Sequence, residues 1–197
     1  MNELNNKPLA MLSDEELIAL FQGGNPEAFD IIVGKFKNPL MNFIYRFTSN
    51  STESEDIVQE TFVKVFVNKH SYKPIAKFST WIYTIAANLA KTQLRRKARI
   101  TFFSSLSKKY DGEEIEFEDK NYNLDSITNT VMMDEIIQKA LDRIPLKYRE
   151  AVVLRDIQDL PYEEIATITG TNIGTVKSRI NRGRDMLRKY LKVSIDE

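Results

Sequence analysis

Cysteine is absent from the 197-residue chain, and histidine occurs once, at His70. Without cysteine there can be no disulfide and no thiolate metal site. A single histidine cannot supply a His-rich metal site, nor a familiar His-based triad without more partners. No pair of carboxylates, set of metal ligands or phosphate-binding loop stands at a catalytic spacing. The sequence therefore predicts a protein that is not an enzyme and uses no cofactor or metal.

Long apolar runs are also missing from the chain. No stretch approaches the roughly 20 residues that a membrane-spanning helix needs. The first residues, MNELNNKPLAML, lack the charged start and long apolar core of a signal peptide. We therefore expect a soluble protein of the reducing cytoplasm, with no membrane insertion.

Neither sign of charge is in excess, because 28 Lys and Arg balance 28 Asp and Glu. That average argues against binding nucleic acid, but the charges are segregated along the chain. Residues 91–109 hold seven basic residues and no acid, and residues 177–192 hold seven against Asp185 alone. Between them, residues 111–119 hold six acids and no base. Local patches set the affinity for phosphate; the alternative is a chance cluster on a solvated face.

The hydrophobic pattern is helical almost throughout residues 14–98. Apolar residues recur at spacings typical of helices, and no alternating run is long enough for a sheet. Helix starts are expected at the capping box Ser13–Glu16, at Asn25 with Pro26, and at the capping box Thr52–Glu55. Residues 69–77 interrupt the pattern before it resumes. This part predicts a compact bundle of about four helices.

Periodicity fades over residues 99–132, whose polar and acidic composition is typical of a flexible linker. It returns over residues 133–193 with four shorter helical patterns. The chain is thus predicted to be all-α. It would have an extension at 1–13, one small helical domain at 14–98, an acidic linker at 99–132, and a second small helical domain at 133–193.

The last two helical patterns have the dimensions of a helix-turn-helix. A short helix precedes the turn 170–172, and a longer basic helix follows. On the longer helix an apolar stripe through Val176 and Ile180 lies opposite polar, donor-rich side chains. Arginine can pair two acceptors on guanine, and Ser and Asn can bond base edges or phosphate. The pattern favours a helix that enters the major groove of DNA, with an ordinary amphipathic surface helix as the alternative.

Three segments, taken together, resemble a known family. They are EDIVQETFVKVF at 55–66, FSTWIYTIAANLAKTQLRR at 78–96 and LPYEEIATITGTNIGTVKSRINRGRDMLRKYL at 160–191. They look like a bacterial extracytoplasmic-function (ECF, group IV) sigma factor of the sigma-70 family. The resemblance covers roughly residues 14–97, as sigma domain 2, and 133–192, as sigma domain 4.

The resemblance implies a transcription initiation factor that binds core RNA polymerase and directs it to promoters. It implies that the −35 element is read as duplex and the −10 element as melted non-template strand. The implied partners are the β′ clamp helices and β flap of core RNA polymerase, promoter DNA and an anti-sigma factor, with no small-molecule substrate.

Positions that match the family motifs give the expected site residues. Contact with the clamp helices is expected from Asp56, Gln59 and Glu60, because acids on the first turns of a helix complement a basic coiled coil; simple helix capping is the alternative. The loop 70–77 would receive a flipped-out base of the −10 strand. Contacts to that strand are expected from Tyr72, Tyr83, Asn88, Arg95 and Arg96.

The −35 readers implied by the resemblance lie on the last helix. They are Lys177, Ser178, Arg179, Asn181, Arg182 and Arg184, of which Arg179 and Arg184 would hold phosphate. The acidic linker residues Glu113, Glu114, Glu116, Glu118 and Asp119 would mimic nucleic acid in the RNA-exit path, or form a plain solvated linker.

A stand-alone helix-turn-helix regulator is the alternative function. It would share the last helix and predict a two-fold symmetric operator. It would not need the EDIVQE motif or the arginine pair that follows FSTW. The number and order of the motifs favour the sigma factor.

Overall fold

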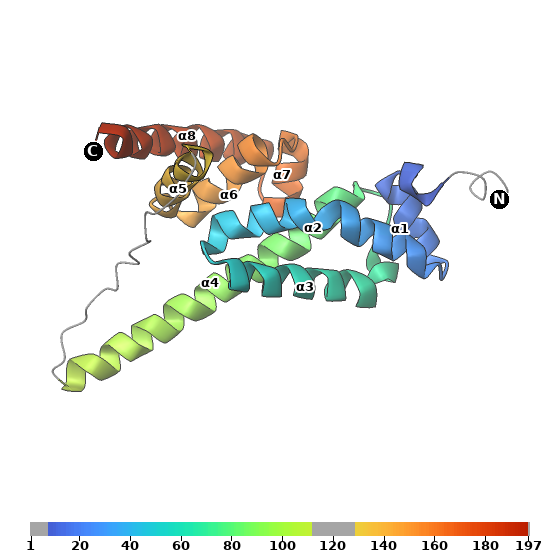
Figure 1. The fold of residues 1–197 in the computed structure, drawn as a ribbon, viewed down its shortest axis with the longest axis horizontal. Coiled ribbons are helices and arrows are strands. Elements are labelled where there is room, and N and C mark those ends of the chain that lie inside the picture. Colours follow the sequence, from blue (N-terminus) through green and yellow to red (C-terminus); the bar gives the residue numbers. More distant parts are fainter. Residues whose placement is uncertain (1–7, 112–128, 197) are drawn as a thin grey trace.

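The computed structural model describes residues 8–111 and 129–196. Within these ranges every regular element is a helix, which confirms the all-α prediction (Figure 1). In chain order they are η2 (Leu9–Met11), α1 (Asp14–Gln22), α2 (Pro26–Thr48), α3 (Ser51–Val67), η3 (Lys69–Ser71), α4 (Phe78–Asp111), α5 (Asn129–Asp142), α6 (Leu146–Val152), the π-helical turn η4 (Val153–Ile157), α7 (Tyr162–Thr169) and α8 (Ile173–Asp196). The acidic residues 113–119 lie outside the described residues.

Two of the expected helix starts are confirmed. The Ser13 hydroxyl accepts a hydrogen bond from the Glu16 N–H at 3.2 Å, and the Glu16 carboxylate accepts one from the Ser13 N–H at 2.7 Å. Asn25 Oδ1 accepts from the Glu27 N–H at 3.0 Å, and Pro26 occupies the first turn. These bonds satisfy backbone donors that a helix start leaves without partners. They fix where α1 and α2 begin.

The capping box predicted at Thr52–Glu55 is wrong, because α3 begins earlier. Asn50 is the N-cap residue, and its side chain accepts from the Glu53 N–H at 2.9 Å. The preceding Ser49 has a left-handed backbone (φ 52°), which ends α2 and turns the chain into α3. Thr52 therefore lies inside the first turn of the helix and is not its N-cap residue.

The fourth helix is longer than the sequence analysis expected. The linker was predicted to begin at residue 99, but α4 continues to Asp111. Residues 78–111 contain no glycine or proline, and the first helix breaker is Gly112. Because no helix-breaking residue intervenes, α4 continues beyond the helical bundle. In Figure 1 its last turns extend away from the other helices.

The core of residues 14–98 forms around α2. Its fully buried residues include Ile32, Leu40, Phe43 and Ile44, which recur at helical spacing. The Phe43 ring meets the Tyr83 ring of α4 edge to face, with centroids 5.2 Å apart. Helices α1, α3 and α4 all pack against α2.

Helices α5 to α8 form the second group. α7 ends at Gly170, whose left-handed backbone (φ 64°) is the conformation that glycine adopts without strain. Asn172 then caps α8 by accepting a hydrogen bond from the Thr175 N–H at 2.7 Å. The turn between these two helices is the one that the sequence predicted.

The two groups of helices pack against one another. α2 lies between α3 on one side and α5 to α7 on the other in Figure 1, and α7 packs against α4. In the described part of the chain, no helix has the length and apolarity to cross a membrane.

The position of the α3 cap can be tested by two single substitutions. We expect Asn50→Ala to lower the free energy of unfolding by about 1 kcal/mol, the usual cost of losing an N-cap side chain. Thr52→Ala should change it by less than about 0.5 kcal/mol, as exposed substitutions do. Urea unfolding of both variants measures this difference. A larger loss of unfolding free energy for Thr52→Ala than for Asn50→Ala would show that Thr52 caps α3, contrary to the structure.

Candidate nucleic-acid and polymerase interfaces

Helix α8 has one buried and one exposed side, as its sequence predicted. Val176 and Ile180 are fully buried within the second group of helices. On the opposite side the exposed residues are Lys177, Ser178, Asn181, Arg182 and Asp185. A helix anchored in this way presents a row of hydrogen-bond donors to solvent, interrupted by the single carboxylate.

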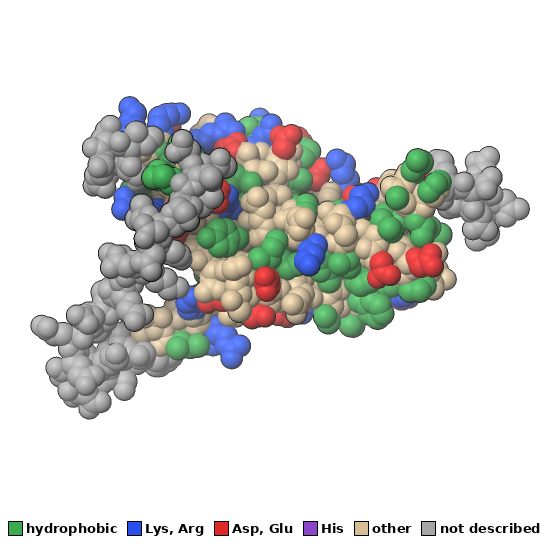
Figure 2. Space-filling view, in the orientation of Figure 1, with side chains coloured by type: hydrophobic (Ala, Val, Ile, Leu, Met, Phe, Trp, Pro, Cys, Tyr) green, Lys and Arg blue, Asp and Glu red, His purple; other side chains and the backbone are tan. Residues whose placement is uncertain are grey.

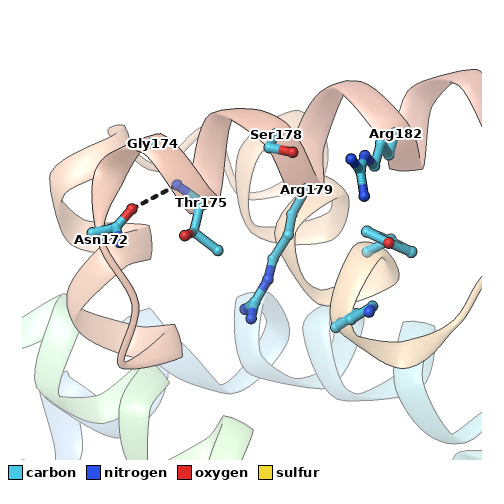
Figure 3. Close-up of a pocket in the computed structure, with 8 residues that line it drawn as sticks. Asn172, Gly174, Thr175, Ser178, Arg179 and Arg182 are labelled. Atoms are coloured by element: carbon cyan, nitrogen blue, oxygen red, sulfur yellow. Dashed lines mark hydrogen bonds between the residues drawn. The ribbon is translucent and has the colours of Figure 1, made fainter.

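A polar cleft of about 430 Å³ lies between α8 and the start of α6. Figure 3 shows side chains from both helices around it. Its lining residues are Lys147, Tyr148, Asn172, Gly174, Thr175, Ser178, Arg179 and Arg182. Three of them, at 178, 179 and 182, belong to the predicted −35 set. The cleft therefore gathers three cationic side chains around donors that can bind an anion.

The tyrosine in this cleft is influenced by its cationic neighbours. A hydrogen bond from Arg182, with a further contribution from Lys147, lowers the pKa of Tyr148 below its usual value. The Lys147 ammonium also lies 4.9 Å from the centroid of the Tyr148 ring. The cleft thus favours negative charge, even at a group that is ordinarily neutral.

Gly183 brings the two walls of the cleft together. A Cβ atom on this glycine would lie 2.4 Å from Val152 Cγ2 and 3.0 Å from the Tyr148 carbonyl oxygen. Only a residue without a side chain allows α6 to approach α8 this closely. The close packing sets Lys147 and Tyr148 beside the exposed side of α8.

The remaining predicted −35 residues lie outside the cleft. Lys177 and Asn181 are exposed on another part of α8. Arg184 is held by Asp156 of η4 through two hydrogen bonds, one from Nε at 2.9 Å, and this pairing raises the pKa of Arg184. Its guanidinium is therefore engaged within the protein, while Arg179 faces the cleft.

The predicted −10 residues fall into two sets. Asn88, Arg95 and Arg96 are exposed along α4. Tyr83 is only 5% exposed, and its hydroxyl donates to Gln158 of the second group at 2.6 Å. Burial raises the pKa of Tyr83. In this arrangement its ring offers no free face on which a base could stack.

Tyr72 has a structural place that the sequence analysis did not foresee. Its ring is 6% exposed and packs against the rings of Phe78 and Trp81. Its hydroxyl donates to the Ala76 carbonyl oxygen at 2.9 Å, which closes the loop 70–77 on itself. We therefore replace its expected role as a base contact with that of supporting the loop.

The three predicted polymerase contacts are brought together on α3. Asp56, Gln59 and Glu60 are all exposed. Beside them, toward the end of α3, is a shallow apolar hollow lined by Phe29, Phe62, Val63 and Phe66. Figure 2 shows hydrophobic side chains gathered over this end of the molecule. Acidic groups beside exposed aromatic rings are suited to a basic, amphipathic partner.

The sequence matches two family models over most of its length. The model for sigma-70 region 2 matches residues 32–100, and that for sigma-70 region 4 matches residues 134–187. Over 172 residues the chain is 36% identical to the ECF RNA polymerase sigma factor SigW of Bacillus subtilis, covering 86% of this chain and 91% of the relative. The chain belongs to the ECF sigma factors of the sigma-70 family.

Two further relatives agree with this assignment. The sigma factor is 31% identical over 192 residues to the RNA polymerase sigma-H factor of Pseudomonas aeruginosa, covering 96% of this chain and 99% of the relative. Its fold is similar to that of the sigma factor RpoE in complex with the anti-sigma factor NepR from Bartonella quintana. That likeness has a TM-score of 0.65 at 28% identity, over 84% of this chain and 97% of the other. An ECF sigma factor directs RNA polymerase in transcription initiation.

Sequence reasoning missed the two cleft residues that α6 of this sigma factor contributes. Lys147 and Tyr148 stand more than twenty residues before α8, in a stretch that carries no motif of its own. The one available signal was Gly183, a glycine inside an otherwise helical pattern, which often marks a close approach of another segment. The sequence did not show which segment approaches.

The role of Gly183 can be tested against a second helical glycine. Gly183→Ala should destabilise the sigma factor by about 1–3 kcal/mol, because overpacking against Val152 outweighs the gain in helix propensity. Gly34→Ala in α2, where an added Cβ meets no atom within 4 Å, should stabilise it by about 0.4–1 kcal/mol. Thermal unfolding measures both. Shifts of the same sign would contradict the close packing of α6 on α8.

Proposed function

We propose that this sigma factor brings core RNA polymerase to promoters by reading the −35 element as duplex and the −10 element as melted non-template strand. The observation that carries the proposal is the occurrence, in one chain, of an exposed acidic and apolar surface on α3 and a cation-lined cleft beside α8. The first suits a protein partner and the second suits DNA. A factor that links polymerase to a promoter needs both.

At the −35 element, α8 enters the major groove and the cleft holds the adjacent backbone. Ser178, Asn181 and Arg182 on the exposed side would reach base edges. Lys147, Tyr148 and Arg179 would bind a phosphate at the groove's edge, which fixes the register of α8. This is the usual division in a helix-turn-helix complex, where one helix reads bases and another contacts the backbone.

At the −10 element, the exposed part of α4 follows the melted strand. Arg95 and Arg96 bind its phosphates, and Asn88 contacts the strand beside them. The loop 70–77, which Tyr72 and Gln22 hold in place, receives an unstacked base; Gln22 donates to the Lys69 and Tyr72 carbonyl oxygens at 2.6 and 3.2 Å. A loop that is fixed before the strand arrives loses little entropy when it binds.

At the polymerase, Asp56, Gln59 and Glu60 meet the β′ clamp helices. The apolar hollow at Phe62, Val63 and Phe66 extends the same surface and supplies the buried area that exposed charges alone do not. The second domain meets the β flap. An anti-sigma factor that covers these surfaces would hold the protein inactive. The similar RpoE structure is a complex with an anti-sigma factor, NepR.

The proposed factor has no catalytic step of its own, because polymerase performs the chemistry. Its work on the chromosome with polymerase places it in the cytoplasm. The alternative function, a stand-alone helix-turn-helix regulator, would explain neither the exposed surface on α3 nor the match to sigma-70 region 2.

Run-off transcription from a random promoter library tests the proposal. Core RNA polymerase with this chain should yield transcripts that share an upstream −35 and −10 pair, and core polymerase alone should not. Gln59→Ala combined with Glu60→Ala should abolish these transcripts, while the exposed Glu163→Ala on α7 should leave them unchanged. Full activity of the double variant, or no selected promoter with a competent core enzyme, would contradict the proposal.

The phosphate contact in the cleft has its own prediction. Lys147→Ala should weaken binding to the selected −35 duplex about equally for all sequences, and should reduce the slope of log K against log salt by about 1. Lys189→Ala, an exposed lysine on α8 that does not line the cleft, is the matched control. Fluorescence anisotropy at several salt concentrations measures both. An unchanged salt slope for Lys147→Ala would show that Lys147 does not contact a phosphate of the DNA.

A further inference from the structure

Helix α1 bonds to the start of the loop 70–77. The Gln22 amide donates hydrogen bonds to the carbonyl oxygens of Lys69 and Tyr72, at 2.6 and 3.2 Å. In return, the Lys69 ammonium donates to the Phe21 carbonyl oxygen at 3.0 Å and lies 4.3 Å from the centroid of the Phe21 ring. The last two residues of α1 therefore hold the backbone where the chain enters the loop.

The same helix bonds to the residue that follows the loop. Phe78 is the first residue of α4, and a helix start leaves such an N–H without a partner inside the helix. The Glu15 carboxylate accepts from this N–H at 3.0 Å, and its negative charge suits the positive end of α4. Burial, with the nearby carboxylates of Glu15 and Asp14, raises the pKa of Tyr72. Glu15 thus lies close to both the end of the loop and the ring that supports it.

Helix α1 is a fixed support for these bonds. Leu17 and Ile18 are fully buried against the core around α2, and the capping box at Ser13 fixes where α1 begins. Glu15 and Gln22 are separated by about two helical turns, so both lie on one side of α1. The distance between the two bonding groups is therefore set by the helix, and with it the distance between the two ends of the loop.

The loop's other contacts hold its backbone less directly. Residues 73–77 are exposed. The bond from the Tyr72 hydroxyl to the Ala76 carbonyl oxygen lies within the loop and does not tie it to another helix. The Lys77 ammonium pairs with Glu164 of α7 at 2.7 Å, but this bond holds the end of a long side chain. The bonds from α1 hold backbone groups on both sides of the exposed stretch.

We propose that α1 positions the loop 70–77 for base recognition, and that Glu15 and Gln22 thereby help to decide which base of the −10 strand the loop accepts. The proposal rests on the proposed function, in which this loop receives an unstacked base. A site for an unstacked base selects it by hydrogen bonds and by the shape of the pocket. Both depend here on where the ends of the loop are held. Glu15 and Gln22 act through the loop and do not touch the DNA.

The effect of losing these bonds should fall on base choice rather than on binding. Without the Gln22 amide, two backbone carbonyl oxygens lose their donor, and the start of the loop opens locally while the buried residues of α1 stay in place. Affinity for the strand's phosphates depends on Arg95 and Arg96, on the exposed part of α4, and should not change.

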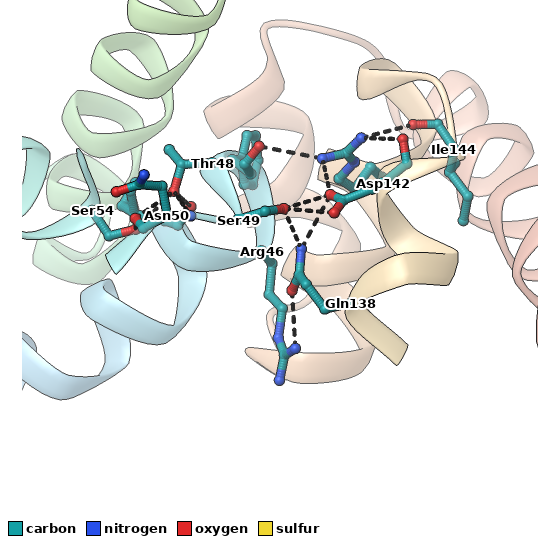
Figure 4. Close-up of polar contacts among 11 residues, drawn as sticks. Arg46, Thr48, Ser49, Asn50, Ser54, Gln138, Asp142 and Ile144 are labelled. Atoms are coloured by element: carbon teal, nitrogen blue, oxygen red, sulfur yellow. Dashed lines mark hydrogen bonds and ion pairs between the residues drawn. The ribbon is translucent and has the colours of Figure 1, made fainter. Parts of the chain in front are cut away.

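Two pairs of variants test the proposal. Gln22→Met keeps the length and helix propensity of the side chain and removes its donor. Its matched control is Gln138→Met, because the Gln138 amide likewise donates to another segment, at 2.9 Å to the Ser49 hydroxyl (Figure 4). Glu15→Ala removes the acceptor for the Phe78 N–H, whereas Glu15→Gln keeps an oxygen that can accept it.

The measurement is run-off transcription by core polymerase with each full-length variant. The promoter library keeps the selected −35 element and randomises the −10 element alone. We expect Gln22→Met and Glu15→Ala to lower the base preference at one and the same −10 position by roughly fivefold, about the effect of one mismatched base. Glu15→Gln and Gln138→Met should keep the preferences of the unmodified chain. A preference is a ratio between transcripts of one reaction, so a lower yield of folded protein does not alter it.

Unchanged preferences in both Gln22→Met and Glu15→Ala would overturn the role of α1. An equal loss in Gln138→Met, or a loss spread over all −10 positions, would show general destabilisation and would overturn it too. If Gln22→Met gives no transcript, the Glu15 pair decides: a loss confined to Glu15→Ala supports the proposal, and equal preferences in the two variants contradict it. These results leave the proposed function standing, whereas the absence of any −10 preference in the unmodified chain would overturn both.

Discussion

The burial of α2 on two sides is the constraint on which the other described helices depend. Its apolar residues pack α1, α3 and α4 into one core, and its last residues bond to α5 and α6. Ser49 takes part in both, because its left-handed backbone starts α3 and its hydroxyl bonds to Asp142. One helix end therefore sets the direction of α3 and the placement of the second group of helices, so a change there would act on both.

The two ends of α4 differ in how far the other helices bury them. Near its start the helix is buried by α1, α2 and the second domain, and the Phe78 N–H bonds to the Glu15 carboxylate at 3.0 Å. From Arg95 to Phe102 its side chains are exposed, and Arg95, Arg96, Lys97 and Arg99 are cationic. Between these ends Tyr83 and Lys91 satisfy their polar groups by contacts with the second group of helices.

Local patterns predicted most of the fold, and contacts between distant segments explain the remainder. The caps at Ser13 and Asn25 and the turn before α8 depend on neighbouring residues, so the sequence located them. The start of α3 was misplaced although its signal is local too, because Asn50 rather than Thr52 is the N-cap residue. The burial of Tyr83 and the approach of α6 to α8 depend on tertiary packing, which periodicity does not report. For that reason the cleft was only partly predicted, and the contacts of α4 with α6 and α7 were not predicted at all.

The absence of cysteine makes the distance between the two groups of helices directly measurable, since two introduced cysteines would be the only labelling sites. Ile75→Cys on the loop and Lys189→Cys on α8 are both exposed positions, one in each domain. Energy transfer between dyes at these sites should show a single population of high efficiency in the free chain, because α2 holds both groups of helices. Several populations of widely different efficiency would contradict an account in which the burial of α2 on two sides fixes the placement of the second group.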